Sequence, residues 1–300
     1  MRVFVTGATG FIGSAIVAEL IDAGHQVTGL ARSDEAAASL TATGAQVHRG
    51  ALEDPGSLRG GAAASDGVIH TAFTNISATT SLADSARADL RAVATIGEAL
   101  AGSGRPFVVT SGIGLLAPGR LATEEDAPDP GSFAAPRIAA EEAALSLAGR
   151  GVRASVVRLP YSVHGEGDHG FVPALIGIAR AKGVSAYPGD GANRWPAVHR
   201  LDAAHLFRLA LEAAPAGARL HGVDDEGVPF RDIAEVIGRH LKLSATAIPR
   251  EEAGSHFGWL GPIVTVDHPA SSTLTQKQLG WHPARPALIP DLDEGHYFGA

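Results

Sequence analysis

The sequence of residues 1–20, MRVFVTGATGFIGSAIVAEL, determines the fold that we expect. Arg2–Thr6 is typical of a buried strand, and the residues after Gly10 have the apolar spacing of a helix. Gly7 permits a tight turn, Gly10 lets the backbone approach a pyrophosphate, and Gly13 allows the helix to pack closely on the strand. The helix N-terminus offers unpaired N–H groups to the anion. The stretch therefore predicts a dinucleotide-binding loop. Its expected contact residues are Gly7, Thr9, Gly10, Phe11 and Ile12.

Short apolar runs alternate with helical patterns through the first half of the chain. This alternation is typical of a parallel sheet covered by helices, so we expect a Rossmann-type, doubly wound α/β fold. After Pro160 the pattern becomes mixed and rich in glycine, proline and aromatic residues, which indicates a small C-terminal α+β lobe. We expect residues 1–165 and 197–220 to form the dinucleotide-binding domain. Residues 166–196 and 221–300 are expected to form a substrate-binding lobe.

Composition and charge exclude several classes of protein. The 300 residues are 45% hydrophobic and carry a formal net charge of −8. Such a chain can bury a sizeable core, but its acidity does not favour binding to a nucleic-acid backbone. It has no cysteine, which excludes disulfides and thiolate metal sites. Because it has neither a long apolar run nor a signal-peptide pattern, we expect a cytoplasmic protein that binds no membrane.

The spacing TGxxGxxG at residues 6–13 resembles that of the extended and atypical branches of the short-chain dehydrogenase/reductase superfamily, which are similar to NAD(P)-dependent epimerases and dehydratases. The resemblance covers nearly the whole chain. It implies that Thr71, Ala72 and Pro160 contact the cofactor. The segments that carry it further are His70–Ala72, Thr110–Ser111, Arg158–Pro160, His164–Asp168 and Asn193–Asp202.

The end of the second expected strand indicates which dinucleotide binds. NAD-binding proteins place a carboxylate there for the ribose hydroxyls, whereas this chain has Arg32 followed by Ser33. A guanidinium and a hydroxyl suit a 2′-phosphate, so we expect NADP(H) as the cofactor. The alternative is an exposed arginine that stacks on adenine, which leaves NAD(H) open. The resemblance implies that Glu53 lies near the adenine; alternatively, Glu53 and Asp54 are an acidic pair at a helix N-terminus.

The superfamily's usual proton donor is missing from this chain. The resemblance implies a tyrosine followed four residues later by a lysine, but Phe133 and Arg137 occupy these positions. Phenylalanine has no exchangeable proton. Arginine stays protonated and cannot pass a proton on, although it can hold a ribose or an anionic oxygen. We expect Arg137 to contact the cofactor.

Three other side chains are candidates for the catalytic chemistry. The resemblance implies that Ser111 is the active-site serine, which would orient the substrate oxygen. Tyr161 follows the turn at Pro160 and is a candidate proton donor; alternatively, it is a packing residue with a satisfied hydroxyl. His164 is another candidate, because imidazoles titrate near neutral pH, or else it is a loop histidine. Water is a further source of the proton.

Aromatic and basic residues indicate the substrate side of the cleft. Arg194 and Trp195 either contact substrate or form a salt-bridged loop arginine and a core tryptophan. Residues 164–169 include four possible metal ligands, but glycines separate them and we expect no metal. The expected substrate contacts are Phe133, Phe171, Arg194 and Trp195.

These observations favour an NADPH-dependent reductase of a carbonyl, C=N or C=C group on a small, partly apolar substrate. The alternative is a non-catalytic NADP(H)-binding sensor that reports to a protein partner. Sugar-nucleotide epimerase or dehydratase activity is disfavoured by Phe133. The resemblance also implies a homodimer formed through the helices that begin near Leu82 and Pro136.

Overall fold

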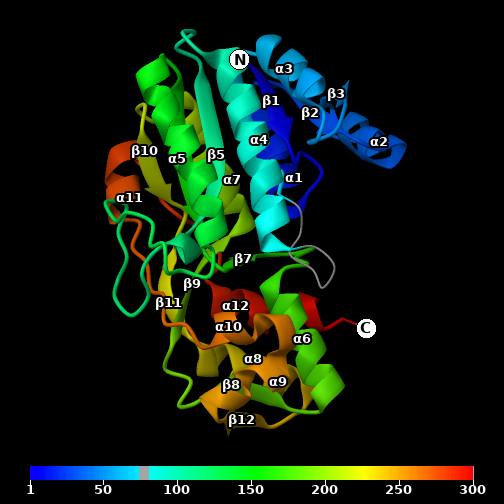
Figure 1. The fold of residues 1–300 in the computed structure, drawn as a ribbon. Coiled ribbons are helices and arrows are strands. Elements are labelled where there is room, and N and C mark those ends of the chain that lie inside the picture. Colours follow the sequence, from blue (N-terminus) through cyan, green and yellow to red (C-terminus); the bar gives the residue numbers. More distant parts are fainter. Residues whose placement is uncertain (74–80, 300) are drawn as a thin grey trace.

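The computed structural model describes residues 1–73 and 81–299. Its main sheet has seven parallel strands in the order β10-β6-β5-β4-β1-β2-β3 (Figure 1). The strand order reverses between β1 and β4, and ligands of such folds bind outside the carboxyl ends of the strands at this point. The predicted Rossmann-type α/β fold is confirmed. The strands are β1 (Arg2–Thr6), β2 (Gln26–Ala31), β3 (Gln46–Arg49), β4 (Gly67–His70), β5 (Pro106–Gly112), β6 (Arg153–Leu159) and β10 (Ala218–His221).

Helices cover both faces of the main sheet, because each buries an apolar side against it. The core on one face includes Leu20 and Phe207, and the core on the other includes Phe4 and Ile96. The first face carries α1 (Phe11–Asp22), α2 (Asp34–Ala42) and α7 (Arg200–Ala213), and the second carries α3 (Pro55–Ala63), α4 (Leu82–Leu100) and α5 (Ile138–Ser146).

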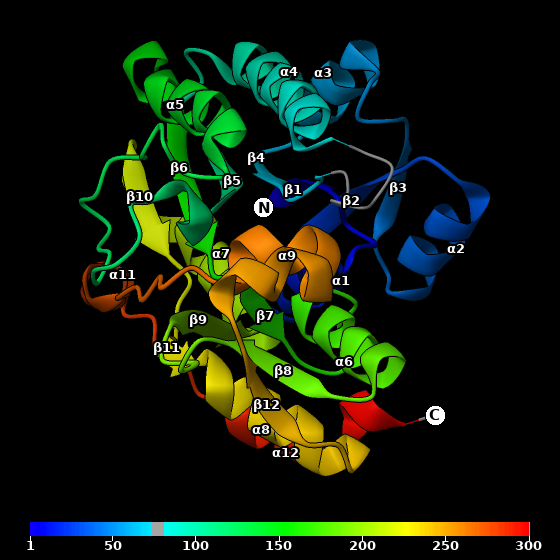
Figure 2. The same cartoon turned by 60° about the horizontal axis from the view of Figure 1, so that its bottom comes forward.

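A smaller lobe with its own apolar core lies beyond the carboxyl ends of the main strands (Figure 1). Figure 2 shows two of its helices, α6 and α8, around the two-stranded sheet of β8 and β12. The lobe's main helices and strands are α6 (Phe171–Lys182), β8 (Ser185–Pro188), α8 (Phe230–Leu241), β12 (Ala245–Ile248), α9 (Ala253–Phe257), α10 (Gly261–Val264) and α12 (Leu288–Asp293). Helix α11 (Thr273–Leu279) instead contacts α7 and β10 of the main sheet.

A second small sheet joins the two parts of the chain. It contains β7 (Ser162–His164), β9 (Arg194–His199) and β11 (Asp225–Pro229). Strands β7 and β9 both contact α7 of the main part and α12 of the lobe. The predicted boundary after residue 165 follows β7, whereas the boundary after residue 196 falls inside β9.

Several short elements are not evident in the sequence. Strand β10 has four residues and pairs with β6, too short a run for its apolar pattern to be distinctive. Helix α3 has the sequence PGSLRGGAA, whose three glycines are unfavourable for a helix. Gly61 is needed there, because a Cβ atom would lie 2.4 Å from the Phe4 ring.

Among the described residues, no helix is long and apolar enough to cross a membrane.

A buried ion pair holds α5 against the main sheet. Arg158 on β6 is fully buried and donates to both carboxylate oxygens of Glu141 on α5, with Nη2 2.5 Å from Oε1. Arg158 Nη1 also donates to the backbone oxygen of Asp126 at 2.9 Å. Two charges removed from water are tolerated when each satisfies the other, but either one alone is costly.

We predict that Glu141→Ala lowers the free energy of unfolding by about 3–5 kcal/mol, because it leaves the Arg158 charge buried without its partner. The double variant Glu141→Leu/Arg158→Met should recover much of this loss, since it removes both charges. Denaturant titration measures both values. The matched control is Glu142→Ala, whose exposed side chain should cost less than about 0.5 kcal/mol. Equal losses for the two single variants would contradict the prediction.

His221 at the end of β10 is buried beside this ion pair. Its Nδ1 lies 2.8 Å from the Ser271 backbone oxygen, and its Nε2 lies 3.4 Å from Arg158 Nη1. Burial lowers the pKa of His221 from its usual 6.5 to about 4. The folded protein therefore keeps this ring neutral at pH values where the unfolded chain protonates it.

We predict that the free energy of unfolding decreases as the pH falls from 6.5 towards 4, because the unfolded state binds more protons in this range. His221→Gln should flatten this dependence, even if it lowers stability at neutral pH. Denaturant titrations at a series of pH values provide the slope. Exposed His169→Gln is the matched control. An unchanged slope in His221→Gln would show that His221 does not carry this effect.

Candidate active site

The loop between β1 and α1 is shaped by close backbone contacts. Gly7 has a φ of +69°, and a Cβ atom there would lie 2.7 Å from Ala72 N. A Cβ atom on Gly13 would lie 2.0 Å from the Gly7 backbone oxygen. Helix α1 begins after Gly10 and has no acidic residue in its first turn, so its N-terminal N–H groups and dipole suit an anion. This loop fits the pyrophosphate of a dinucleotide.

The neighbouring residues on the β4 side also meet this loop. Thr71 Oγ1 donates to the Thr6 backbone oxygen at 2.8 Å, and Ala72 N donates to Thr6 Oγ1 at 3.4 Å. Phe11, at the start of α1, lies under the guanidinium of Arg200, 4.9 Å from its ring centre. The residues predicted to contact the cofactor at the end of β1, at the start of α1 and after β4 therefore all lie around the loop between β1 and α1.

The carboxyl ends of β2 and β3 carry two arginines. Arg32 is exposed and forms no ion pair within the described part of the chain. Ser33 Oγ accepts a hydrogen bond from Ala36 N at 3.1 Å and so caps α2. Arg49 is level with Ala31 in the strand register, and it donates to Asp34 at 2.5 Å. This edge of the sheet is thus basic, with one guanidinium free of an acidic neighbour among the described residues.

Glu53 is exposed in the turn after β3, whereas its neighbour Asp54 has a structural contact. Asp54 Oδ1 accepts hydrogen bonds from Gly56 N and Ser57 N at 2.9 and 3.2 Å. Of the two acids, only Asp54 caps α3. The contact predicted between Glu53 and adenine stays a prediction.

Arg137 lies where the strand ends meet α5. Its Nη2 donates to the Thr110 backbone oxygen at 3.2 Å and lies 3.9 Å from Asp89 Oδ2. Its guanidinium carbon lies 4.2 Å from the centre of the Phe73 ring. Burial lowers the pKa of Arg137, while the charges of Asp89 and Glu141 oppose that shift. Its Nε is buried and has no hydrogen-bond partner among the described residues.

Asp89 connects Arg137 to the nucleotide-binding strands. Its Oδ1 accepts from His70 Nε2 at 2.9 Å, and His70 Nδ1 lies 2.6 Å from Thr6 Oγ1. With Nε2 donating to the carboxylate, Nδ1 is the acceptor for the threonine hydroxyl. This buried chain fixes the carboxylate that faces Arg137.

Two glycines at the end of β5 lie directly beside Phe133 and Arg137. A Cβ atom on Gly112 would lie 3.7 Å from Arg137 Nη1. A Cβ atom on Gly114 would lie 3.1 Å from Phe133 Cζ and 3.3 Å from Tyr161 Cε1. The rings of Phe133 and Tyr161 have their centres 6.1 Å apart. A guanidinium and two aromatic rings therefore surround the glycines at the carboxyl end of β5.

The hydroxyl of Ser111 is committed to a neighbouring residue. Ser111 is buried, and its Oγ donates to Glu141 Oε2. Side chains alternate between the faces of a strand. Ser111 therefore shares its face with Arg158, its partner in the register, while the next residue, Gly112, adjoins Arg137.

Tyr161 and His164 are also hydrogen-bonded in the protein interior. Tyr161 OH lies 2.6 Å from His268 Nδ1, and His268 Nε2 lies 2.8 Å from the Leu116 backbone oxygen. Because that carbonyl requires a donor, Nδ1 accepts the tyrosine proton. Burial raises the pKa of Tyr161 and lowers that of His268. His164 is fully buried, with Nδ1 2.8 Å from Asp291 Oδ2.

The predicted substrate contacts fall into two groups. Phe171 is half-buried, and its ring centre lies 6.3 Å from that of Tyr161 and 5.7 Å from that of Trp259. Trp195 is fully buried in the lobe core. Arg194 donates to both carboxylate oxygens of Asp267, at 2.9 and 2.8 Å. Phe133, Phe171 and Trp195 thus all adjoin Tyr161, with the Trp195 ring centre 5.4 Å from that of Tyr161, whereas Arg194 is paired with Asp267.

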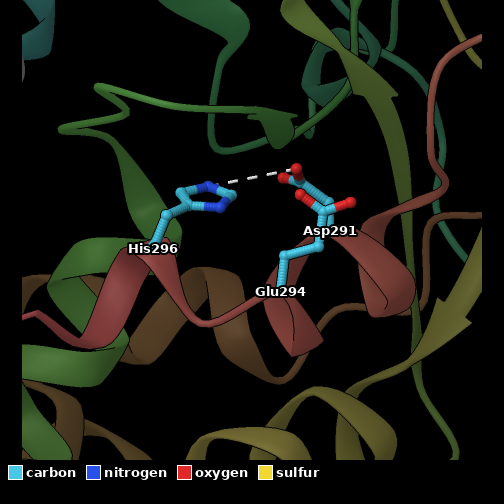
Figure 3. Close-up of side chains that lie close together, drawn as sticks. All are labelled: Asp291, Glu294 and His296. Atoms are coloured by element: carbon cyan, nitrogen blue, oxygen red, sulfur yellow. Dashed lines mark ion pairs between the residues drawn. The ribbon is translucent and has the colours of Figure 1, made fainter.

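One cluster of side chains of metal-ligating types lies at the end of α12 in the lobe, next to His164. Asp291, Glu294 and His296 have ligand atoms within 4.8 Å of one another (Figure 3). Glu294 and His296 are exposed, and the buried carboxylate of Asp291 already accepts a hydrogen bond from His164. The cluster has an ordinary explanation as a hydrogen-bonded helix end.

Some residues of this site are absent from the sequence predictions. Gly112 and Gly114 form a G-x-G directly after a predicted strand, a signal that was available. Phe73 follows the predicted cofactor contacts by one residue. Asp89 and His268 give no local signal, because their partners are distant in the sequence.

Comparison with known proteins agrees with this arrangement. A model of the NAD dependent epimerase/dehydratase family matches residues 3–221. An uncharacterised protein of Schizosaccharomyces pombe is 49% identical over 99% of this chain and 100% of its own length. The 4-hydroxy-2-methyl-3-oxo-4-farnesyl-3,4-dihydroquinoline-1-oxide ketoreductase of Stigmatella aurantiaca is 30% identical over 86% of this chain and 80% of its own length.

The fold also matches a solved structure along nearly its whole length. The crystal structure of DesIV, a dTDP-glucose 4,6-dehydratase from Streptomyces venezuelae with NAD and TYD bound, has a TM-score of 0.79 at 20% identity. The match covers 99% of this chain and 96% of that chain. From the glycine loop, the strand order and these relatives, it follows that the chain belongs to the NAD-dependent epimerase/dehydratase family and is an enzyme of the NAD(P)-dependent oxidoreductase type.

Proposed function

We propose that this enzyme is an NADPH-dependent reductase of a carbonyl group, or of a related C=N or C=C bond, on a small and partly apolar substrate. The observation that carries the proposal is the guanidinium of Arg137, which lies beside Gly112 and over the Phe73 ring. The Phe133 ring adjoins Gly114, two residues further along the chain. A permanent cation at the edge of an apolar surface suits a substrate oxygen that gains negative charge. The ketoreductase from Stigmatella aurantiaca supports a reductase among the family's activities.

The preference for NADPH rests on Arg32. Its exposed guanidinium follows β2, where a carboxylate would instead suit the ribose hydroxyls of NAD. Ser33 caps α2 through its oxygen, and its hydroxyl proton is still able to donate to a phosphate. Arg49 lies on the neighbouring strand and neutralises Asp34, the first acid of this edge.

We propose that Arg137 binds the substrate oxygen and that water supplies the proton. When bound, NADPH supplies the hydride. Ser111, Tyr161 and His164 were the predicted catalytic residues, but each directs its hydroxyl or ring N–H into a bond with another protein group. Their catalytic roles stay predictions, and their hydrogen bonds favour Arg137 instead. We also propose a homodimer through α4 and α5, as the resemblance implies.

We predict that Arg32→Ala raises the Kd for NADPH about 10- to 100-fold and leaves the Kd for NADH nearly unchanged. A hydrogen bond to a charged group contributes about 1.5–3 kcal/mol, and about 1.4 kcal/mol corresponds to tenfold in affinity. Fluorescence titration with each reduced dinucleotide measures both constants. Arg239→Ala, in the lobe and paired with Asp293, is the matched control. An equal loss for both dinucleotides would mean that Arg32 contacts the adenine rather than a 2′-phosphate.

We predict that purified enzyme oxidises NADPH in the presence of some aldehydes, ketones, imines or activated alkenes. Arg137→Met should lower kcat about 10²–10³-fold, the loss typical of removing one group that stabilises developing negative charge. Steady-state kinetics over a broad substrate panel provide the test. Tight NADPH binding without turnover of any compound would refute the reductase and favour the non-catalytic sensor.

A further inference from the structure

The groups around the end of β5 can stabilise an anion but have no proton ready to give. The hydroxyl of Ser111 is bonded to Glu141 and that of Tyr161 to His268. Arg137 keeps its proton at any ordinary pH. The hydroxyls of Thr110 and Ser132 are buried without a hydrogen-bond partner among the described residues, but an aliphatic hydroxyl is not an acid near neutral pH. The described groups at this place are therefore one guanidinium, two neutral hydroxyls and aromatic rings.

Such a donor set distinguishes between two kinds of hydride acceptor. Hydride addition to an isolated ketone leaves an alkoxide, a base about as strong as hydroxide, which needs a proton donor at the oxygen. Hydride addition to the β-carbon of a conjugated carbonyl leaves an enolate, whose charge is delocalised as in a phenolate. Water and phenol differ by about six pKa units, so the oxygen of the enolate is far less basic than the oxygen of the alkoxide. A cation alone is adequate at the enolate oxygen, and the proton that completes the reaction goes to carbon instead.

The shape of the site agrees with a flat, conjugated substrate. Gly112 and Gly114 have no side chains to project from the end of β5, and the rings of Phe133 and Tyr161 approach Gly114 closely. The guanidinium carbon of Arg137 lies over the Phe73 ring, 4.2 Å from its centre, in a cation–π contact that fixes the position of the charge. An aromatic border with one oriented cation fits a planar apolar molecule that carries a single anionic oxygen.

We infer that the substrate class of this site is an α,β-unsaturated carbonyl compound, reduced at its C=C bond with Arg137 holding the enolate oxygen. The inference rests on the proposed NADPH-dependent reductase. In the reaction, the β-carbon receives hydride from NADPH, which becomes NADP⁺, and the C=C electron pair moves towards the carbonyl oxygen. The α-carbon of the enolate then takes one proton from water, and the saturated carbonyl compound leaves.

A binding experiment tests the anion site without any turnover. The probe is 4-nitrophenol, whose yellow phenolate imitates a flat enolate, added to the enzyme with NADP⁺. The wild type should bind the phenolate at least about tenfold more tightly than the neutral phenol, which lowers the apparent pKa of the bound probe. Arg137→Met should remove this preference and Arg137→Lys should keep part of it. Arg239→Met, which changes an exposed arginine of α8 in the lobe, is the control. Equal affinity for both forms in the wild type would overturn the inference.

Product analysis separates failure of this inference from failure of the proposed function. The panel contains matched pairs, such as 4-phenylbut-3-en-2-one and 4-phenylbutan-2-one, with NADPH that carries deuterium at C4. The expected product is the saturated ketone with deuterium at its β-carbon, and at least about tenfold slower reaction of the saturated partner. Deuterium at the alcohol carbon instead would keep the reductase but overturn the conjugated substrate class. No NADPH oxidation with any pair would overturn both.

Discussion

The buried carboxylate of Glu141 is the interaction on which the α5 side of the cleft depends. It accepts from Arg158 on β6 and from Ser111 on β5, and so joins the helix to two central strands. A charge in this position needs its partners, since an unpaired carboxylate in the interior is costly. The same carboxylate accepts the Ser111 hydroxyl, so one structural requirement fixes both the position of α5 and the hydrogen bond of the serine that was predicted to be catalytic. The catalytic role of Ser111 stays a prediction.

The fold was accessible from the sequence because local patterns and the global architecture agree. Periodicity locates the loop after β1, the strands up to β6 and helix α8, because these elements are long or have clear turn residues at their ends. β10 and the strands between Pro160 and Pro196 are three to six residues long, and their pairing is set by partners distant in the sequence. Such pairings leave little trace in a local pattern.

The candidate site was accessible in part. The replacement of a tyrosine and a lysine by Phe133 and Arg137 is plain in the sequence, and in the structure Arg137 adjoins Gly112 and Phe133 adjoins Gly114. The role expected of Ser111 stays a prediction, and the bond of its hydroxyl to Glu141 joins residues 30 positions apart, which a local pattern does not reveal. The bond between Tyr161 and His268 joins residues 107 positions apart, so no motif revealed it.

Tyr161 and His268 have a structural role that explains why the cleft keeps its shape. His268 belongs to a segment that is bound to the loop after β5: Gly119 N donates to the Asp267 oxygen, and Ala122 exchanges bonds with Pro269 and Ser271. The tyrosine hydroxyl adds a buried side-chain bond to these backbone bonds, directly behind the ring that adjoins Gly114. An aromatic ring fixed at both its edge and its hydroxyl cannot turn to follow a substrate. The border beside Arg137 is therefore preorganised, which is the condition under which a fixed cation is most effective at stabilising developing charge.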